Sequence, residues 1–261
     1  MSLTEKMANG VLFMTAPNID APHAFTTRFG GVSRGIYESL NLSVNLGDDP
    51  GCVRENYGRI CGALDISDSD IVCSRQVHGT VVRAVGRADR GMLFTTARLE
   101  ADGLTTCEAG VTLAVFTADC TPILLYDPVR KAVAAVHAGW RGTVADIAGE
   151  AVRRMAAEFG CRPADIRAAI GPCISVCCYE TGPDVPDALH RTLGAEADNC
   201  ITPFGAKFRV DLKNANRLLL VRAGLSDIIV SDECTACRSD KFWSHRATKG
   251  KRGSQAAFIR I

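Results

Sequence analysis

Three residues whose side chains bind metals stand at the ends of segments that are typical of strands. His78 lies in the turn Q-V-H-G, Cys120 follows a continuous apolar run in T-A-D-C-T-P, and His137 ends the run V-A-A-V-H before a glycine-rich turn. Strand ends present side chains to a crevice, where ligands and catalytic groups gather. We therefore expect these three residues to share one site.

Two imidazoles and one thiolate are donor types that Zn²⁺ prefers. Three protein ligands leave the fourth position open, as in catalytic zinc sites, where the metal lowers the pKa of its bound water to about 7. The same residues also have ordinary explanations, because a histidine is often hydrogen-bonded in a turn and a thiol is often buried as a small hydrophobe. Their spacing matches no standard zinc motif.

Two other chemistries fit the same three residues. Cys120 beside a histidine can form a thiolate–imidazolium pair, as in cysteine hydrolases. Two histidines and a cysteine are also the first coordination shell of blue-copper proteins. A multicopper oxidase needs many histidines, however, and this chain has five.

The composition bounds the class of protein. The chain has 261 residues, 47% hydrophobic and 23% charged, with a net charge of +1, which is ordinary for a globular protein and shows no nucleic-acid footprint. We find no signal peptide and no run near the roughly 20 apolar residues of a membrane span. We expect a cytoplasmic monomer with no nucleic-acid or membrane partner. The basic run from Arg246 to Arg252 is interpreted as a solvated loop.

The elements that must position the three residues are mostly strands. Apolar, β-rich runs bounded by Gly, Pro, Asp or Asn predict strands at 22–28, 69–75, 80–85, 111–117, 122–127, 131–137, 165–170, 206–210, 227–231 and 255–261. Helical periodicity predicts helices at 50–63, 143–159 (capped by Thr143 and Gly160), 184–193 and 211–223 (capped by Asp211). Several strands follow one another directly, which favours one α+β domain of mixed β-sheets layered with α-helices over residues 1–261.

Twelve cysteines are many for such a chain, and we expect most to be buried. The motif C-T-A-C (234–237) is a lone C-x-x-C, which is weak evidence for structural zinc, and the neighbouring pair Cys177–Cys178 is interpreted as packing.

Several motifs together resemble one family: R-F-G-G-V-S, Q-V-H-G, A-D-G-L-T-T, T-A-D-C-T-P-I-L-L-Y-D, A-A-V-H-A-G-W-R-G, I-G-P-C-I, Y-E-T-G, D-L-K-N-A-N and C-T-A-C…F-W-S-H-R. The chain is identified as a member of the YfiH-type laccase-domain family, whose members carry the names purine nucleoside phosphorylase, polyphenol oxidase and peptidoglycan-editing factor. The resemblance covers nearly the whole chain, from about Phe25 to Ile261. It implies a YfiH-like α+β domain and a zinc site whose ligands match His78, Cys120 and His137.

The resemblance also implies an activity, namely phosphorolysis of adenosine, inosine, guanosine and 5′-methylthioadenosine. Adenosine deamination is a second implied activity. Oxidation of phenols is a third, and it would follow from loading the same ligands with copper, the alternative metal. The implied small-molecule partners are a nucleoside and phosphate.

For this chemistry we hypothesise the following roles. His78 and Cys120 act at the metal, and Asp119 shuttles a proton. Arg28 or Arg141 binds phosphate, and Asn41 contacts the ribose or the base. Gly139 and Gly142 are expected to permit the backbone angles of the turn.

The chain departs from the family pattern at three arginines. Tyr57 follows Asn56 where the family has arginine, Ala247 stands in the late S-x-R-R pattern, and Ser254 stands in the G-R-Q pattern. The main rival function is a hydrolase or amidase that uses Cys120 as its nucleophile on a peptidoglycan precursor. A third and weaker candidate function is a binding module without activity, because such a module would not need a metal site with an open coordination position.

Overall fold

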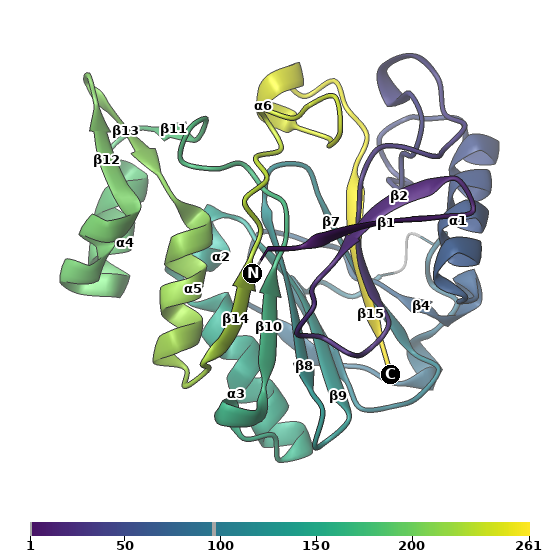
Figure 1. Ribbon diagram of the computed structural model, residues 1–261, viewed down its shortest axis with the longest axis horizontal. Coiled ribbons are helices and arrows are strands. Elements are labelled where there is room, and N and C mark those ends of the chain that lie inside the picture. The colour runs from purple at the N-terminus through teal and green to yellow at the C-terminus, as the bar shows by residue number, and fades with distance from the viewer. Residues whose placement is uncertain (1, 96–97) are drawn as a thin grey trace.

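Two six-stranded sheets, each with parallel and antiparallel pairs, form the centre of the molecule (Figure 1), in a computed structural model that describes residues 2–95 and 98–261. The first sheet has the order β1 (Thr4–Ala8), β2 (Val11–Thr15), β3 (His23–Thr26), β15 (Gln255–Arg260), β7 (Thr112–Thr117) and β4 (Ile71–Val72). The second has the order β14 (Asp227–Val230), β10 (Arg167–Ile170), β8 (Thr121–Asp127), β9 (Ala132–Ala138), β6 (Gly103–Thr106) and β5 (Val82–Ala84). A small third sheet joins β11 (Glu180–Thr181), β13 (Lys207–Val210) and β12 (Ile201–Phe204).

Alternating side chains on the central strands explain why the two large sheets stack. On β8, Ile123 and Leu125 belong to the apolar cluster on the helical side, while Leu124 and Tyr126 belong to the cluster between the sheets. Both faces of this strand are therefore apolar, as expected for a strand that is covered on both sides. Burying a leucine such as Leu124 fully stabilises the fold by about 1.5–3 kcal/mol.

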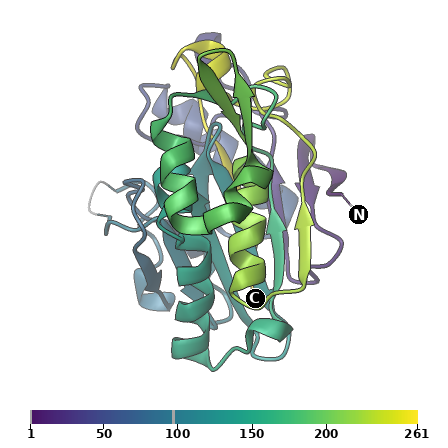
Figure 2. The same ribbon diagram turned by 90° about the vertical axis from the view of Figure 1, so that its left-hand side faces the viewer.

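Helices cover the outer faces of both sheets. The helix α1 (Pro50–Leu64) packs on the first sheet, and α2 (Trp140–Val144), α3 (Ile147–Phe159) and α5 (Leu212–Arg222) lie beside the second, as Figures 1 and 2 show. The helix α4 (Asp184–Leu193) lies farther out, next to α5 and the small third sheet (Figure 1). The short α6 (His245–Thr248) lies near one end of the sheets. Carboxylates cap the starts of two of these helices, since the side chain of Asp49 accepts from Cys52 N–H and that of Asp211, the predicted cap, accepts from Asn214 N–H.

The predicted fold class is confirmed. All ten predicted strands and the helices α1, α4 and α5 lie at or near the expected positions. The strands β1, β2, β6, β11 and β12 were not predicted. Within the described residues, no helix is long and apolar enough to cross a membrane.

The predicted helix over 143–159 is wrong at its start. Two helices replace it, because the chain turns through Asp146, whose backbone is left-handed with φ 59° and whose side chain caps α3 by accepting from Gly149 N–H. Thr143 lies inside α2 rather than at a cap, and its hydroxyl accepts a hydrogen bond from Asn216. The predicted stop at Gly160 is confirmed, with φ 67°.

Candidate active site

The structure brings His78, Cys120 and His137 together. In the antiparallel pair β8–β9, Pro122 lies opposite His137, so Cys120 just before β8 and His137 near the end of β9 reach the same edge of the sheet. His78 comes from the loop between β4 and β5. Its Nε2 lies 3.7 Å from Cys120 Sγ, and its ring meets that of His137 edge to face at 4.8 Å. The potential ligand atoms of this trio all lie within 4.8 Å of one another.

Asp102, at the start of β6, holds two members of the trio in place. Its side chain is fully buried, and its Oδ1 lies 2.8 Å from Nδ1 of His137 and accepts the backbone N–H of His78 at 2.9 Å. Its Oδ2 accepts the N–H of Gly79 at 2.7 Å. A bond between the carboxylate and Nδ1 leaves Nε2 of His137 free to bind a ligand, which is the usual arrangement behind a metal-binding histidine.

The charges of the site are strongly coupled. Burial acts to raise the pKa of Cys120, but hydrogen bonding and charge from His137 and His78 outweigh it and lower that pKa to about 6. Burial acts to lower the pKa of His137, but its bonds to Asp102 and Cys120 raise that pKa to about 9. Without a metal, Cys120 and His137 therefore form a thiolate–imidazolium pair at neutral pH.

The backbone is strained where it presents the trio. His78 has φ 61° and Asp119, immediately before Cys120, has φ 91°, and neither residue is glycine. Such conformations cost on the order of 1–3 kcal/mol each and cluster at functional sites. The hydrogen bonds of Asp102 to the turn at 77–79 help to hold the first of these conformations.

The glycines of the V-H-A-G-W-R-G turn have a different role from the one we expected. Gly139 has φ −70° and Gly142 lies within α2, so neither needs the conformational freedom of glycine. A Cβ on Gly139 would lie 2.8 Å from Cδ2 of His78 and 3.4 Å from Sγ of Cys120. Gly139 is therefore required because two members of the trio approach its backbone closely.

Two cavities meet at the trio. One, of about 460 Å³, is called the polar cavity because polar and basic side chains line part of its wall, including Gln76, Arg75 and Arg98. The other, of about 340 Å³, has a more apolar wall that includes Trp140, Tyr179, Ile174 and Leu212. His78, Ala118, Cys120 and Arg252 line both. These volumes fall within the range of small-molecule sites, about 300–1,000 Å³.

The comparisons with known proteins place the chain in a family. A family model described as multi-copper polyphenol oxidoreductase laccase matches residues 22–261. The chain belongs to this laccase-domain family. The relatives of this chain include the purine nucleoside phosphorylase YlmD of Geobacillus stearothermophilus, at 40% identity over 264 residues that cover 98% of this chain and 96% of that protein. The purine nucleoside phosphorylase of Deinococcus radiodurans is 41% identical, with coverage of 97% and 94%.

Solved structures agree with this membership. The crystal structure of YlmD from Geobacillus stearothermophilus matches with a TM-score of 0.94 at 38% identity, covering 100% of this chain and 99% of that one. The crystal structure of the hypothetical protein YfiH from Bacillus licheniformis matches with a TM-score of 0.93 at 35% identity, covering 98% of each chain. The resemblance drawn from the sequence motifs is thus confirmed.

The trio of this laccase-domain chain fits a zinc ion. A tetrahedral zinc with bonds of about 2.0–2.3 Å keeps its ligand atoms roughly 3.3–3.8 Å apart, and Sγ of Cys120 lies 3.7 Å from Nε2 of His78. One thiolate and two imidazoles, with a carboxylate behind one imidazole, are a donor set that zinc accepts. His23, by contrast, is a core histidine, with both ring nitrogens within 2.7 Å of backbone atoms, of Ala16 and of Ala21.

The predicted substrate residues separate into two groups. Arg141 lines the apolar cavity, where its guanidinium lies 4.4 Å from the centre of the Trp140 ring. Arg28 instead packs over Trp243 and donates to the carbonyl oxygen of Ser239 at 2.9 Å. Asn41 is fully buried, and its Oδ1 accepts the N–H groups of Ser43 and Ser254, each at 3.0 Å. Arg28 and Asn41 therefore hold loops together, and Asn41 fixes two segments that line the polar cavity.

Asp119 borders the apolar cavity, but both of its carboxylate oxygens are occupied. Oδ1 accepts the hydroxyl of Thr235 at 2.7 Å, and Oδ2 accepts the N–H of Arg246 at 2.7 Å. These bonds tie the strained turn before Cys120 to two later loops, which is the work of a positioning residue.

Sequence reasoning missed Asp102, Tyr179 and Arg252. The interpretation of the run from Arg246 to Arg252 as solvated fits Arg246, Lys249 and Lys251, which are exposed. It missed that Arg246 lines one cavity at the trio and that the half-buried Arg252 lines both. Burial lowers the pKa of Arg252, while the charges of Asp119 and Cys120 act to raise it. The motif A-D-G-L-T-T, which contains Asp102, and the basic run, which contains Arg252, both stood out in the sequence. Only the fold places these two residues beside the trio.

Proposed function

We propose that the chain is a zinc-dependent purine nucleoside phosphorylase acting on adenosine, inosine, guanosine and 5′-methylthioadenosine. The observation that carries the proposal is the convergence of His78, Cys120 and His137 where an aromatic-walled cavity and an arginine-lined cavity meet. The names of the relatives, purine nucleoside phosphorylases in Geobacillus and Deinococcus, support the same reaction class.

The apolar cavity suits the purine. Trp140 and Tyr179 each border it, and aromatic faces bind a flat base by stacking. Ile174 and Leu212 supply apolar contact, and Arg141 stands at the wall with its charge. A nucleoside in this cavity has its ribose directed toward the trio, where the two cavities join.

Arg252 is the group best placed to bind phosphate. It lines both cavities, and its NH1 donates to the carbonyl oxygen of Gly253 and the hydroxyl of Ser254. Its buried Nε has no hydrogen-bond partner among the described residues. In the same polar cavity, Arg75 is paired with Glu100, and Arg98 donates to the carbonyl oxygens of Met92 and Leu93. Arg252 thus retains an unused donor for an anion.

The reaction joins a phosphate oxygen to C1′ of the ribose as the bond from C1′ to the purine breaks and the purine takes up the electron pair. His78, Cys120 and His137 would hold the zinc, which would supply a Lewis acid for an oxygen of a bound ligand. Arg252 holds the phosphate by charge, and the cavity walls fix the purine so that the two reactants meet. Asp102 orients His137, and Asp119 fixes the turn that carries Cys120.

Adenosine deamination is proposed as a side activity of the same site. In this reaction water attacks C6 of adenine, the bond from C6 to the amino nitrogen breaks, and ammonia leaves as inosine forms. Because the carboxylate of Asp119 is occupied by Thr235 and Arg246, we propose a positioning role for it rather than a proton shuttle.

A cysteine hydrolase acting on peptidoglycan precursors is the second candidate. The specific observation in its favour is the thiolate–imidazolium pair, with the pKa of Cys120 at about 6 and that of His137 at about 9. Copper in the same trio, giving oxidation of phenols, is the alternative for the metal.

We further propose that residues 1–261 form one catalytic domain and act as a cytoplasmic monomer. The late strand β15 lies between β3 and β7 in the first sheet, so distant parts of the chain build one sheet. All twelve cysteines are free, as expected in a reducing compartment. Analytical ultracentrifugation tests the monomer.

The deciding assay follows adenosine with and without phosphate by chromatography. The proposal predicts adenine and ribose 1-phosphate in equal amounts, only when phosphate is present, and a slower formation of inosine that needs no phosphate. Protein without metal should be inactive. A metal-free protein that turns over a peptidoglycan precursor and is inactivated by iodoacetamide at Cys120 would establish the rival instead.

A further inference from the structure

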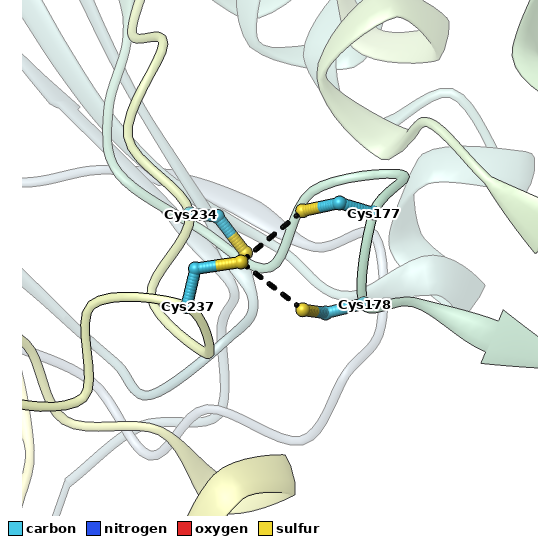
Figure 3. A group of neighbouring side chains, drawn as sticks. All are labelled: Cys177, Cys178, Cys234 and Cys237. Carbon is cyan, nitrogen blue, oxygen red and sulfur yellow. Dashed lines mark hydrogen bonds between the residues drawn. The ribbon is translucent and has the colours of Figure 1, made fainter.

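Four cysteines that the proposed function does not use gather at one point. Cys177 and Cys178 follow β10, and Cys234 and Cys237 lie in the C-T-A-C motif that follows β14. Figure 3 shows the four side chains pointing toward a common centre. All four Sγ atoms lie within 4.8 Å of one another, and Sγ of Cys237 lies 3.5 Å from that of Cys177 and 3.3 Å from that of Cys178.

The sheet explains why two distant cysteine pairs meet. The strands β10 and β14 are parallel neighbours, so the chain leaves both at the same edge. The two loops stay paired beyond the strands, since Cys173 and Cys234 form a parallel bridge and Thr235 N–H donates to the carbonyl oxygen of Cys173 at 3.1 Å. The sequence gives no hint of this pairing, because 56 or more residues separate the two motifs.

Packing does not account for the cluster. Cys177 and Cys237 are exposed and Cys178 is half-buried, whereas a cysteine that serves only as a small hydrophobe is buried. The earlier interpretation of Cys177–Cys178 as packing is therefore wrong for Cys177. Cys234 is buried, and its Sγ accepts the backbone N–H of Ser175 at 3.3 Å, a bond that stabilises a thiolate.

We infer that Cys177, Cys178, Cys234 and Cys237 bind a second Zn²⁺ ion, in a closed structural site distinct from the trio. Four sulfurs at about 2.3 Å from a tetrahedral zinc lie roughly 3.8 Å apart, and Sγ of Cys237 lies 3.5 and 3.3 Å from those of Cys177 and Cys178. A tetrahedral set of four thiolates selects zinc or iron among the common metals. With four protein ligands no position remains for water or substrate, so the site holds loops rather than reacts.

The loops that this zinc joins both contact the active site. Ile174 N–H, in the loop of Cys177, donates to the carbonyl oxygen of Asp119 at 3.0 Å. The hydroxyl of Thr235, in the loop of Cys234, donates to the carboxylate of Asp119 at 2.7 Å. Tyr179, directly after Cys178, lines the apolar cavity. The closed site thus braces the strained turn that presents Cys120.

The test is a metal count by mass spectrometry on protein expressed with zinc and without added copper. Two zinc ions per chain are expected in the unaltered protein and in the control Cys107→Ser, which changes an exposed cysteine outside the cluster. One zinc is expected in His78→Ala and one in Cys177→Ser/Cys178→Ser. A zinc-free His78→Ala protein would overturn the inference. So would a His78→Ala/Cys177→Ser/Cys178→Ser protein that still binds one zinc ion.

A second measurement covers the case in which the cysteine variant does not fold. His78→Ala loaded with Co²⁺ should show the intense sulfur-to-metal charge-transfer bands of four thiolates. Intact-mass analysis without reductant should show all twelve cysteines as free thiols once metal is removed. A mass lower by two hydrogens at the cluster would show a disulfide and contradict the inference. Failure of phosphorolysis with two zinc ions bound would contradict the proposed function alone.

Discussion

The trio and the four-cysteine cluster differ in the structural elements that position their side chains. His137 and Cys120 stand at the edge of a packed sheet, and Asp102 from a third strand holds His137 from behind. The four cysteines stand on two surface loops that extend one pair of parallel strands. The trio offers three donors and opens to two cavities, while the cluster offers four donors and lines neither of these cavities.

The comparison shows how one fold can hold a reactive metal site and a separate structural metal site. A site with an open position needs rigid surroundings, because a shift of about 1 Å can cost a hundredfold in rate. The sheet gives that rigidity to His137 but not to the turn before Cys120, whose backbone is strained. Asp119 connects this turn to both cysteine-bearing loops, so the closed site supports the open one.

The largest effect should come from the trio itself. His78→Ala removes an imidazole donor, so phosphorolysis should fall to the level of a reaction without enzyme, and one zinc should be lost. The matched control is His190→Ala, which removes an exposed histidine on α4 that bonds Pro186 and Asp198. Steady-state rates with adenosine check both variants, and an active, zinc-poor His78→Ala protein would break the assignment of the open site.

The next effect separates the polar cavity from the apolar one. Arg252→Met keeps an unbranched stem and removes the guanidinium charge, and loss of one preorganised donor typically costs about 10²–10³-fold in kcat. The loss should grow when phosphate is scarce, because Arg252 is assigned to phosphate. Arg191→Met on α4 is the control. If only the KM for the nucleoside rose in Arg252→Met, the phosphate site would have to be placed elsewhere.

A smaller effect should show that the two metal sites are held independently. Asp102→Asn weakens the support of His137, and loss of such a partner costs about 10–100-fold in metal affinity. Zinc competition with a chelator should show this loss at the trio and an unchanged affinity at the four cysteines. Equal weakening of both sites would mean that the variant acts by general unfolding.

The pH dependence of zinc uptake at the trio follows from the two shifted pKa values. Between pH about 6 and about 9 the metal-free site holds a thiolate on Cys120 and a proton on His137, and zinc must displace that proton. The apparent association constant should therefore rise tenfold per pH unit over this range and level off above it. Below pH about 6 the slope should steepen, because Cys120 must also lose a proton. Calorimetry in Cys177→Ser/Cys178→Ser, across buffers, measures the protons released, and a flat profile would contradict the assigned pair.

The smallest effect should be the action of the closed site on the open one. Cys177→Ser/Cys178→Ser should lower kcat/KM by about threefold, within the usual range for coupling through packed contacts. Asp119→Asn should produce a loss of the same kind, and the double change should be less than additive because both act on one turn. Fully additive losses would separate the cluster from the active site.

The strands could be predicted from sequence because their signal is local. The alternating and continuous apolar runs at 111–117, 122–127 and 131–137 fall where β7, β8 and β9 lie. The helix break at Asp146 was missed because apolar periodicity continues through it, and only the cap geometry reveals the new start. The strand β1 was missed because four of its five residues are exposed, so it carries no apolar run.

The three residues of the trio could be predicted because each lies at the end of a recognisable strand-like run. The residues that contact or surround the trio could not be predicted in this way. Asp102 and Arg252 reach the trio only through long-range pairing of β6 with β9 and through the late loop before β15. Gly139 was interpreted from its type as a turn residue, yet its reason is the approach of the His78 ring. The meeting of Cys177–Cys178 with C-T-A-C depends on β10 lying beside β14, which no local pattern encodes.

The most direct test of the central claim adds zinc back to metal-free protein while ribose 1-phosphate is measured. The account predicts no product from adenosine and phosphate before zinc is added, and a rise in rate that saturates as the trio fills. The same titration of His78→Ala should yield no product at any zinc level. Full activity before zinc is added, abolished by alkylation of Cys120, would contradict the account.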